Sequence, residues 1–257
     1  MKSQPAAIFI GATDTGVGKT LVSALLLDYW QRRGVEGGYL KWVATGGDGG
    51  PPEDWRLVAG RSDLSGSALP AASGQQPTGP GGVGDPPDWR CDPDLAVPYQ
   101  FRLAASPHLA AEREGREIDP RRLRASFSQA LAAHEMLVVE GVGGLLVPLT
   151  RHLLLLDLVA QLRIPTLLVA RSGLGTINHT LLSLEALRGR DLPLAGVVFS
   201  DEAEELPTVI VEDNLRTIAE LGRVPVLGRL PRCRDLAAAR RAFIPIGEKL
   251  LPAVAAQ

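Results

Sequence analysis

Short runs of consecutive apolar residues alternate along the chain with longer stretches of helical periodicity. A run that is apolar at every position is typical of a strand covered on both of its faces. Such runs predict strands at residues 6–10, 39–43, 136–139, 166–170, 195–199 and 224–227. Apolar residues three or four positions apart predict helices at residues 19–33, 106–115, 120–133, 153–162, 176–188 and 208–221.

The alternation of strands and helices indicates the fold class. Consecutive parallel strands joined by helices form right-handed crossovers, which place the helices on the faces of the sheet. We therefore expect an α/β fold with a doubly wound, mostly parallel sheet and helices on both faces. The chain shows no internal repeat, so this pattern predicts a single domain over residues 1–257.

One segment interrupts the alternation. Residues 62–93 contain six glycines and six prolines, a composition that excludes a long helix or a central strand. We expect a surface excursion at about 62–93, either a tolerated insertion or a functional lid.

The amino-acid composition argues against several classes of protein. Lys plus Arg numbers 27 and Asp plus Glu numbers 29, so the near-neutral charge argues against a nucleic-acid-coating protein. The two cysteines, Cys91 and Cys233, are far apart, which excludes a disulfide scaffold and is typical of a reducing compartment. No apolar run approaches the roughly 20 residues that span a membrane, and we expect a cytoplasmic protein without a signal peptide.

A glycine-rich loop lies between the first predicted strand and the first predicted helix. Residues 11–20 read Gly-Ala-Thr-Asp-Thr-Gly-Val-Gly-Lys-Thr, a variant of the phosphate-binding loop with Thr13 where the strict pattern has glycine. Glycines let successive backbone N–H groups point at a phosphate, and the helix start adds partial positive charge. The motif predicts binding of ATP, with Lys19 on the β- and γ-phosphates and the Thr20 hydroxyl on Mg²⁺.

Two acidic residues are candidates to complete a metal site. Glu140 follows an apolar strand directly, and a carboxylate at the carboxyl end of a parallel strand lies beside the phosphate loop. Asp54 follows the second predicted strand, where it is either a further oxygen ligand or an exposed residue at a helix start.

Two further positions have both a functional and a structural interpretation. Lys41 lies near the carboxyl end of the second predicted strand and is either solvated or directed into the crevice of the sheet. Residues 173–179, Gly-Leu-Gly-Thr-Ile-Asn-His, open a predicted helix. That helix start either binds an anion through its N–H groups, or is capped by Thr176 in the ordinary way.

The chain resembles the dethiobiotin synthetase family in several motifs that occur in the same order. The resemblance spans nearly the whole chain and is carried by residues 13–20, 41–46, 106–111, 140–149, 173–179 and 225–228. Together these motifs are far more specific than any one of them.

The resemblance implies a P-loop NTPase-like fold, a homodimer, and ATP-dependent carboxylation of 7,8-diaminopelargonic acid with CO₂ or bicarbonate to give dethiobiotin. In this chemistry an amine captures CO₂ as a carbamate. The carbamate attacks the γ-phosphate of ATP to give a carbamic–phosphoric anhydride and ADP. The second amine then closes the ring and expels phosphate.

The resemblance also implies residue roles. The implied catalytic residues are Lys41, Lys19 and Thr15, and the implied Mg²⁺ ligands are Thr20, Asp54 and Glu140. The implied nucleotide-binding residues are Gly16, Val17, Gly18, Lys19, Thr20, Ser200, Leu230 and Pro231. The implied substrate-binding residues are Thr45, Val142, Gly143, Gly175, Thr176 and Asn178.

The chain departs from the family at three positions, with Ala12 for a usual glycine, Trp42 for proline and Ser200 for asparagine. These departures leave open a catalytically weakened paralogue. A partitioning-type ATPase is a second alternative, although such proteins carry an extra lysine early in the loop. An amide-forming ligase of the cobyrinic acid type is disfavoured by the chain length and by the placement of Cys91 in the Gly/Pro-rich segment.

Overall fold

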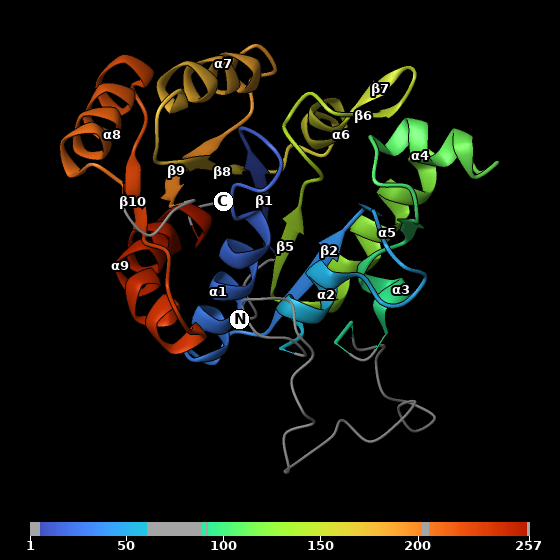
Figure 1. Cartoon of the computed structure of the whole chain (residues 1–257). Helices are drawn as coiled ribbons and strands as arrows, with labels where there is room; N and C mark the ends of the chain where they lie inside the picture. The colour runs from blue at the N-terminus through green and yellow to red at the C-terminus, as the bar shows by residue number, and fades with distance from the viewer. Residues whose placement is uncertain (1–5, 61–88, 91, 202–205, 256–257) are drawn as a thin grey trace.

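The computed structural model describes residues 6–60, 89–90, 92–201 and 206–255, with side chains described as far as residue 250. A six-stranded sheet in the order β10-β9-β8-β1-β5-β2 forms its centre (Figure 1). All five neighbouring pairs of strands are parallel. The strands are β1 (Ala6–Ala12), β2 (Gly37–Lys41), β5 (Met136–Glu140), β8 (Thr166–Arg171), β9 (Leu194–Ser200) and β10 (Val226–Leu230).

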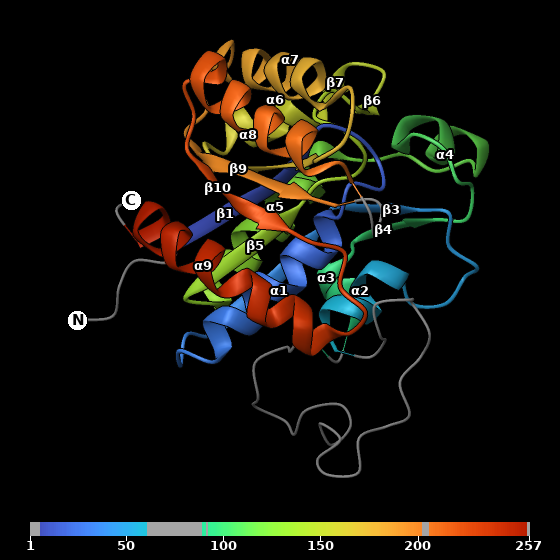
Figure 2. The same ribbon diagram turned by 60° about the vertical axis from the view of Figure 1, so that its left-hand side comes forward.

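Helices cover both faces of this sheet (Figure 2), and each face has its own apolar core. One face packs against α1 (Lys19–Gln31) and α9 (Leu236–Ala255). The other packs against α5 (Pro120–Ala133), α6 (Leu155–Gln161), α7 (Thr176–Arg188) and α8 (Thr208–Gly222). The predicted doubly wound α/β fold is therefore confirmed.

Smaller elements surround the β2 edge and the neighbouring loops. Two short parallel strands, β3 (Val43–Thr45) and β4 (Tyr99–Phe101), pair with each other, and β6 (Pro148–Thr150) forms an antiparallel pair with β7 (Leu153–Leu154). The remaining helices are α2 (Glu53–Val58), α3 (Pro93–Ala96) and α4 (Pro107–Arg113).

Some predicted boundaries are wrong. The strand predicted at 39–43 is two strands in different sheets, because the chain leaves the central sheet at Trp42, whose Nε1 donates to the Leu123 carbonyl oxygen at 3.0 Å. The strand predicted at 224–227 begins later, at Val226, since Pro225 has no N–H for the ladder.

One helix prediction needs correction, and one helix was not predicted. The helix predicted at 153–162 begins at Leu155, because Leu153 and Leu154 pair with β6. The C-terminal helix α9 was not predicted. It contains Pro245 in its interior, and proline ordinarily ends or kinks a helix.

Most of the Gly/Pro-rich segment predicted as a surface excursion lies outside the described residues. At its described end Trp89 is 3 % exposed, so this end belongs to the core. Within the described part of the chain, no helix is long and apolar enough to cross a membrane.

Candidate active site

The loop between β1 and α1 has the backbone conformation of an anion cradle. Gly16 and Gly18 have φ angles of 74° and 95°, in the left-handed region that glycine adopts without steric cost. A Cβ atom at Gly18 would approach Ser200 Oγ to 2.7 Å, so the close contact itself requires glycine. α1 begins directly after Gly18, and the N–H groups of its first turn lack intrahelical partners.

Lys19 is folded back onto the loop that carries it. Its Nζ atom donates a hydrogen bond to the Asp14 carbonyl oxygen at 3.2 Å. Burial lowers the pKa of Lys19 to about 8, with the negative charge of Glu140 opposing the effect. Among the described residues no carboxylate lies within ion-pair distance of Lys19, so an incoming phosphate would supply its counter-charge.

Thr20, Asp54 and Glu140 come together around Lys41. Thr20 Oγ1 lies 2.7 Å from Asp54 Oδ1 and 2.8 Å from Glu140 Oε1. Lys41 Nζ lies 2.6 Å from Asp54 Oδ2 and 2.8 Å from Glu140 Oε1. Lys41 and Glu140 are also register partners at the carboxyl ends of β2 and β5. The sheet therefore places the lysine and one carboxylate together, and α2 brings the other.

The charges in this cluster are mutually dependent. Burial alone would lower the pKa of Lys41, but Glu140 and Asp54 outweigh burial and raise the pKa above its ordinary value. Burial would likewise raise the pKa of Asp54, but Lys41 and the Thr20 hydroxyl hold that pKa below its usual range. At neutral pH Lys41 is a cation and Asp54 an anion.

Thr20, Asp54 and Glu140 fit a Mg²⁺ ion, and the adjoining loop fits the phosphates of a nucleoside triphosphate. One hydroxyl and two carboxylate groups supply the oxygen ligands that Mg²⁺ prefers, and phosphate oxygens ordinarily complete such a site. Neither carboxylate is left without a positive charge, because Lys41 contacts both. No group of three or more His, Cys, Asp or Glu side chains in the described ranges is arranged to hold a metal ion.

Tyr39 contributes to the cluster and was missed from the sequence. Its hydroxyl donates to Glu140 Oε2 at 3.0 Å, and the ring is buried. Burial and the neighbouring Glu140 raise the pKa of Tyr39 well above its ordinary value, so the phenol stays neutral and remains a donor. In the sequence Tyr39 resembles the other apolar residues of its strand. The one signal is that Tyr39 lies two positions before Lys41 in β2, which places both side chains on the same face of the sheet.

Asp14 and Arg171 form a second missed contact, at the outer side of the loop. Arg171 Nη2 lies 3.1 Å from Asp14 Oδ2, while Asp14 Oδ1 accepts from the Thr15 backbone N–H at 2.7 Å. Arg171 ends β8, the neighbour of β1. The pair therefore joins the phosphate loop to the adjacent strand.

The other predicted substrate residues lie in three places. Gly143 adjoins Thr15, since a Cβ at Gly143 would lie 3.4 Å from Thr15 Oγ1, and Val142 precedes it in the loop after β5. Gly175 and Asn178 are exposed at the start of α7, where Gly175 has a φ of 87°.

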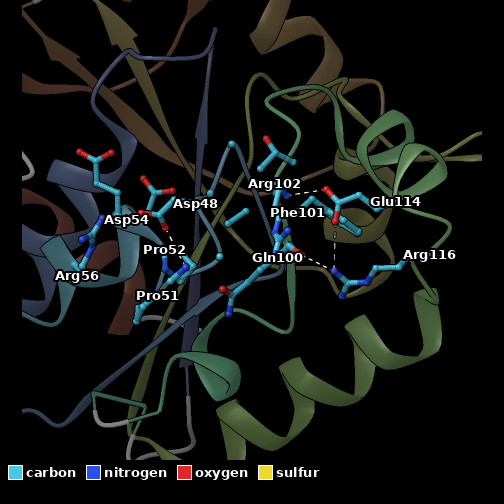
Figure 3. Close-up of a pocket in the computed structure, with 17 residues that line it drawn as sticks. Asp48, Pro51, Pro52, Asp54, Arg56, Gln100, Phe101, Arg102, Glu114 and Arg116 are labelled. Carbon is cyan, nitrogen blue, oxygen red and sulfur yellow. Dashed lines mark hydrogen bonds and ion pairs between the residues drawn. The ribbon is translucent and has the colours of Figure 1, made fainter.

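Thr176 and Thr45 have different surroundings. Thr176 is fully buried, and its hydroxyl lies 3.3 Å from that of Thr180. Its backbone N–H donates to the Gly173 carbonyl oxygen. Thr45 lies with Asp54 in the wall of a cavity of about 440 Å³. In Figure 3, Asp48, Asp54 and Arg56 lie on one side of this cavity, and Arg102, Glu114 and Arg116 lie on the other.

The predicted nucleotide-base residues lie at the ends of β9 and β10. Ser200 is the last residue of β9, and the next backbone N–H, that of Asp201, donates to the Leu230 carbonyl oxygen at 3.0 Å. Arg229 contacts both carboxylate oxygens of Asp201, at 2.9 and 3.0 Å from its Nε. Pro231 follows Leu230, the last residue of β10. These contacts hold the two strand ends together beside Gly18 of the loop.

The parallel sheet and the phosphate loop together define a P-loop NTPase-like protein. A family model described as an AAA domain matches residues 6–70 and 88–240. The chain is 44 % identical over 239 residues to the ATP-dependent dethiobiotin synthetase BioD of Rhodopseudomonas palustris (strain BisB5), covering 92 % of each chain. It is 42 % identical to the protein of the same name from Brucella ovis, covering 89 % of this chain and 87 % of that one. The chain belongs to the dethiobiotin synthetase family, as its motifs predicted.

Solved structures show the same fold at low sequence identity. The cell division ATPase MinD of Pyrococcus furiosus superposes with a TM-score of 0.54 at 16 % identity, covering 98 % of this chain and 99 % of that one. The MinC:MinD cell division complex of Aquifex aeolicus gives a TM-score of 0.55 at 12 % identity, covering 96 % of each chain. This likeness concerns the fold alone.

Proposed function

We propose that this chain is an ATP-dependent dethiobiotin synthetase that acts on 7,8-diaminopelargonic acid and CO₂ or bicarbonate with MgATP. One observation carries the proposal beyond family membership. The ammonium nitrogen of Lys41, at a strand end, lies within 2.6 to 2.8 Å of both candidate metal carboxylates, Asp54 and Glu140. The hydroxyl of Thr20 in the phosphate loop contacts the same two carboxylates. The Lys41 ammonium would therefore lie next to the substrate oxygens at the point where the γ-phosphoryl group of ATP is transferred.

The phosphate loop would position the nucleotide. Gly16, Val17 and Gly18 direct backbone N–H groups to the phosphates, and Lys19 moves from the Asp14 carbonyl to them. Ser200, Leu230 and Pro231 lie where the base would be read. Thr20, Asp54 and Glu140 would hold Mg²⁺, which neutralises charge on the phosphates when bound.

Lys41 would act as an electrostatic residue and not as a base. Glu140 and Asp54 raise its pKa above the ordinary value, so Lys41 carries a positive charge in the neutral range. A fixed ammonium instead stabilises anionic oxygens of the carbamate and of the transferred phosphoryl group. Thr15 and Thr45 would donate hydrogen bonds to the same oxygens, and Val142 and Gly143 would line the adjoining wall.

The far end of the substrate would bind at the start of α7 in a second copy of the chain. Gly175 is exposed there, α7 adds partial positive charge, and Asn178 adds an exposed amide donor. A carboxylate fixed at this point orients the two amines toward Lys41. The active unit would therefore be a homodimer.

Incubation with diaminopelargonic acid, bicarbonate and MgATP, followed by mass spectrometry for dethiobiotin, tests this proposal. We expect dethiobiotin and ADP to form in equal amounts, and no dethiobiotin with Lys41→Met. ATP hydrolysis that is independent of the diamino acid would indicate a partitioning-type ATPase instead. Nucleotide binding without either product would indicate the weakened paralogue.

A further inference from the structure

Trp89 contacts one neighbour of each candidate metal carboxylate, Tyr39 beside Glu140 and Trp55 next to Asp54 in the chain. It precedes α3 and packs into the apolar core beneath α1, only 3 % exposed. Its indole Nε1 donates to the Gly37 carbonyl oxygen of β2 at 3.2 Å, which fixes the residue against the sheet edge.

One line of contact runs from Trp89 to Glu140. The ring centroids of Trp89 and Tyr39 are 5.7 Å apart with an interplanar angle of 46°. The Tyr39 hydroxyl then donates to Glu140 Oε2 at 3.0 Å. Because Tyr39 is 1 % exposed, packing against Trp89 helps to decide where its hydroxyl points.

A second line runs from Trp89 to Asp54. The carbonyl oxygen of Trp89 accepts a hydrogen bond from Trp55 Nε1 at 2.8 Å, and Trp55 follows Asp54 directly in α2 (Glu53–Val58). A helix of this length is not stable by itself, so tertiary contacts must hold it. The buried Trp55 side chain supplies such an anchor.

We propose that Trp89 is a positioning residue for the Mg²⁺ site, holding Glu140 through Tyr39 and Asp54 through Trp55. The inference rests on the Mg²⁺ site of the proposed function. Hydrogen-bonded partners behind metal ligands fix ligand orientation, and their loss typically weakens metal binding by about 10- to 100-fold. Trp89 acts through one intervening residue, so Trp89→Phe should weaken Mg²⁺ binding by about three- to tenfold. Tyr39→Phe, which removes the hydroxyl that contacts Glu140, should weaken it by about tenfold.

The test measures binding of Mn²⁺ in the presence of ADP, by the loss of the free Mn²⁺ electron paramagnetic resonance signal, without any turnover. The variants are Trp89→Phe, which keeps a ring, Trp55→Phe, which leaves Trp89 itself in place, and Tyr39→Phe. Trp30→Phe is the matched control, since Trp30 is equally buried in the same core and has no described contact with either carboxylate. All three test variants should bind Mn²⁺ more weakly than Trp30→Phe does, at equal thermal stability.

A double-mutant cycle separates positioning from general loosening of the core. If Trp55 acts through Asp54, Trp55→Phe has no further effect on Mn²⁺ binding in an Asp54→Asn background, whereas independent effects would add. Unchanged Mn²⁺ binding in Trp89→Phe and Trp55→Phe, with Asp54→Asn impaired, overturns the inference and leaves the metal site intact. Equal binding by wild type and by both Asp54→Asn and Glu140→Gln overturns the metal site itself, and the inference with it.

Discussion

Lys41 and Glu140 are register partners on adjacent parallel strands, and the ammonium nitrogen of Lys41 lies 2.8 Å from Glu140 Oε1. The Glu140 side chain is fully buried and that of Lys41 is 7 % exposed. Removing one partner of such a pair leaves a buried charge without compensation, which commonly costs about 3 to 5 kcal/mol.

Lys41→Met should therefore lower the free energy of unfolding by about 3 kcal/mol. Added Mg²⁺ and ADP should recover part of this loss, because a bound cation replaces the missing charge. Urea unfolding with and without MgADP measures both quantities. In kinetics the variant should lose single-turnover chemistry much more than ATP affinity, and the reverse pattern would contradict the role assigned to Lys41.

The lowered pKa of Lys19 predicts that ATP binding depends on pH. In the free protein its pKa is about 8, and a bound phosphate raises that pKa because it favours the charged form. Affinity for ATP should be highest below pH 8 and should fall as the pH rises through 8, with a proton taken up on binding above that pH. Calorimetry in buffers of different ionisation enthalpy measures the uptake.

Lys19→Ala is the control for this titration and should abolish the proton uptake. It should also reduce turnover by about 10²- to 10³-fold, by analogy with the loss of one oxyanion donor. Turnover at the wild-type rate in this variant would exclude a role for Lys19 at the transferred phosphate.

Asp54→Asn and Glu140→Gln keep the side-chain shape but remove one negative charge each. Both should shift the Mg²⁺ titration of activity to higher concentration, since Mg²⁺ binds carboxylate oxygens far better than amide oxygens. Glu140→Gln should have the larger effect, because Glu140 is the more deeply buried of the two. If the titration with Asp54→Asn matches wild type, Asp54 has only a structural role at the start of α2.

The presence of Ser200 in place of the family's asparagine predicts that the protein discriminates weakly among nucleotide bases. Its short side chain offers one hydroxyl where the family has an amide with both a donor and an acceptor, and its Oγ lies against Gly18. ATP, GTP and CTP should therefore support turnover with similar kcat/KM in competition assays. A strong preference for ATP would indicate that backbone groups near Leu230 and Pro231 read the base.

The proposed cross-subunit site predicts complementation between two impaired variants at limiting diamino acid. Gly175→Val forces a branched residue into a left-handed backbone and should raise KM for the diamino acid, with ATP binding unchanged. A mixture of Gly175→Val and Lys41→Met should then recover about a quarter of wild-type activity, because half of the randomly formed dimers carry one intact site. No recovery after subunit exchange would contradict a site shared between subunits.

Much of this fold could be predicted from local sequence. The helix boundaries at Pro120–Ala133 and Thr176–Arg188 match the prediction at both ends, because apolar periodicity and flanking glycine or proline are short-range properties. The phosphate loop is equally local, since ten consecutive residues carry the glycines, Lys19 and Thr20. Positions after predicted strands pointed to Lys41, Asp54 and Glu140 one by one, and the family resemblance implied their roles.

Only the tertiary structure decided how these residues meet. The register of β2 against β5 places Lys41 beside Glu140, 99 positions apart, and a shift of one residue would turn one of the two side chains to the opposite face. The same holds for Tyr39, which reads as an ordinary strand residue until β5 brings Glu140 to its hydroxyl, and for Trp89, whose contacts lie on β2 and α2. Apolar pattern determines which residues are buried, whereas the pairing of distant strands determines which buried polar groups find each other.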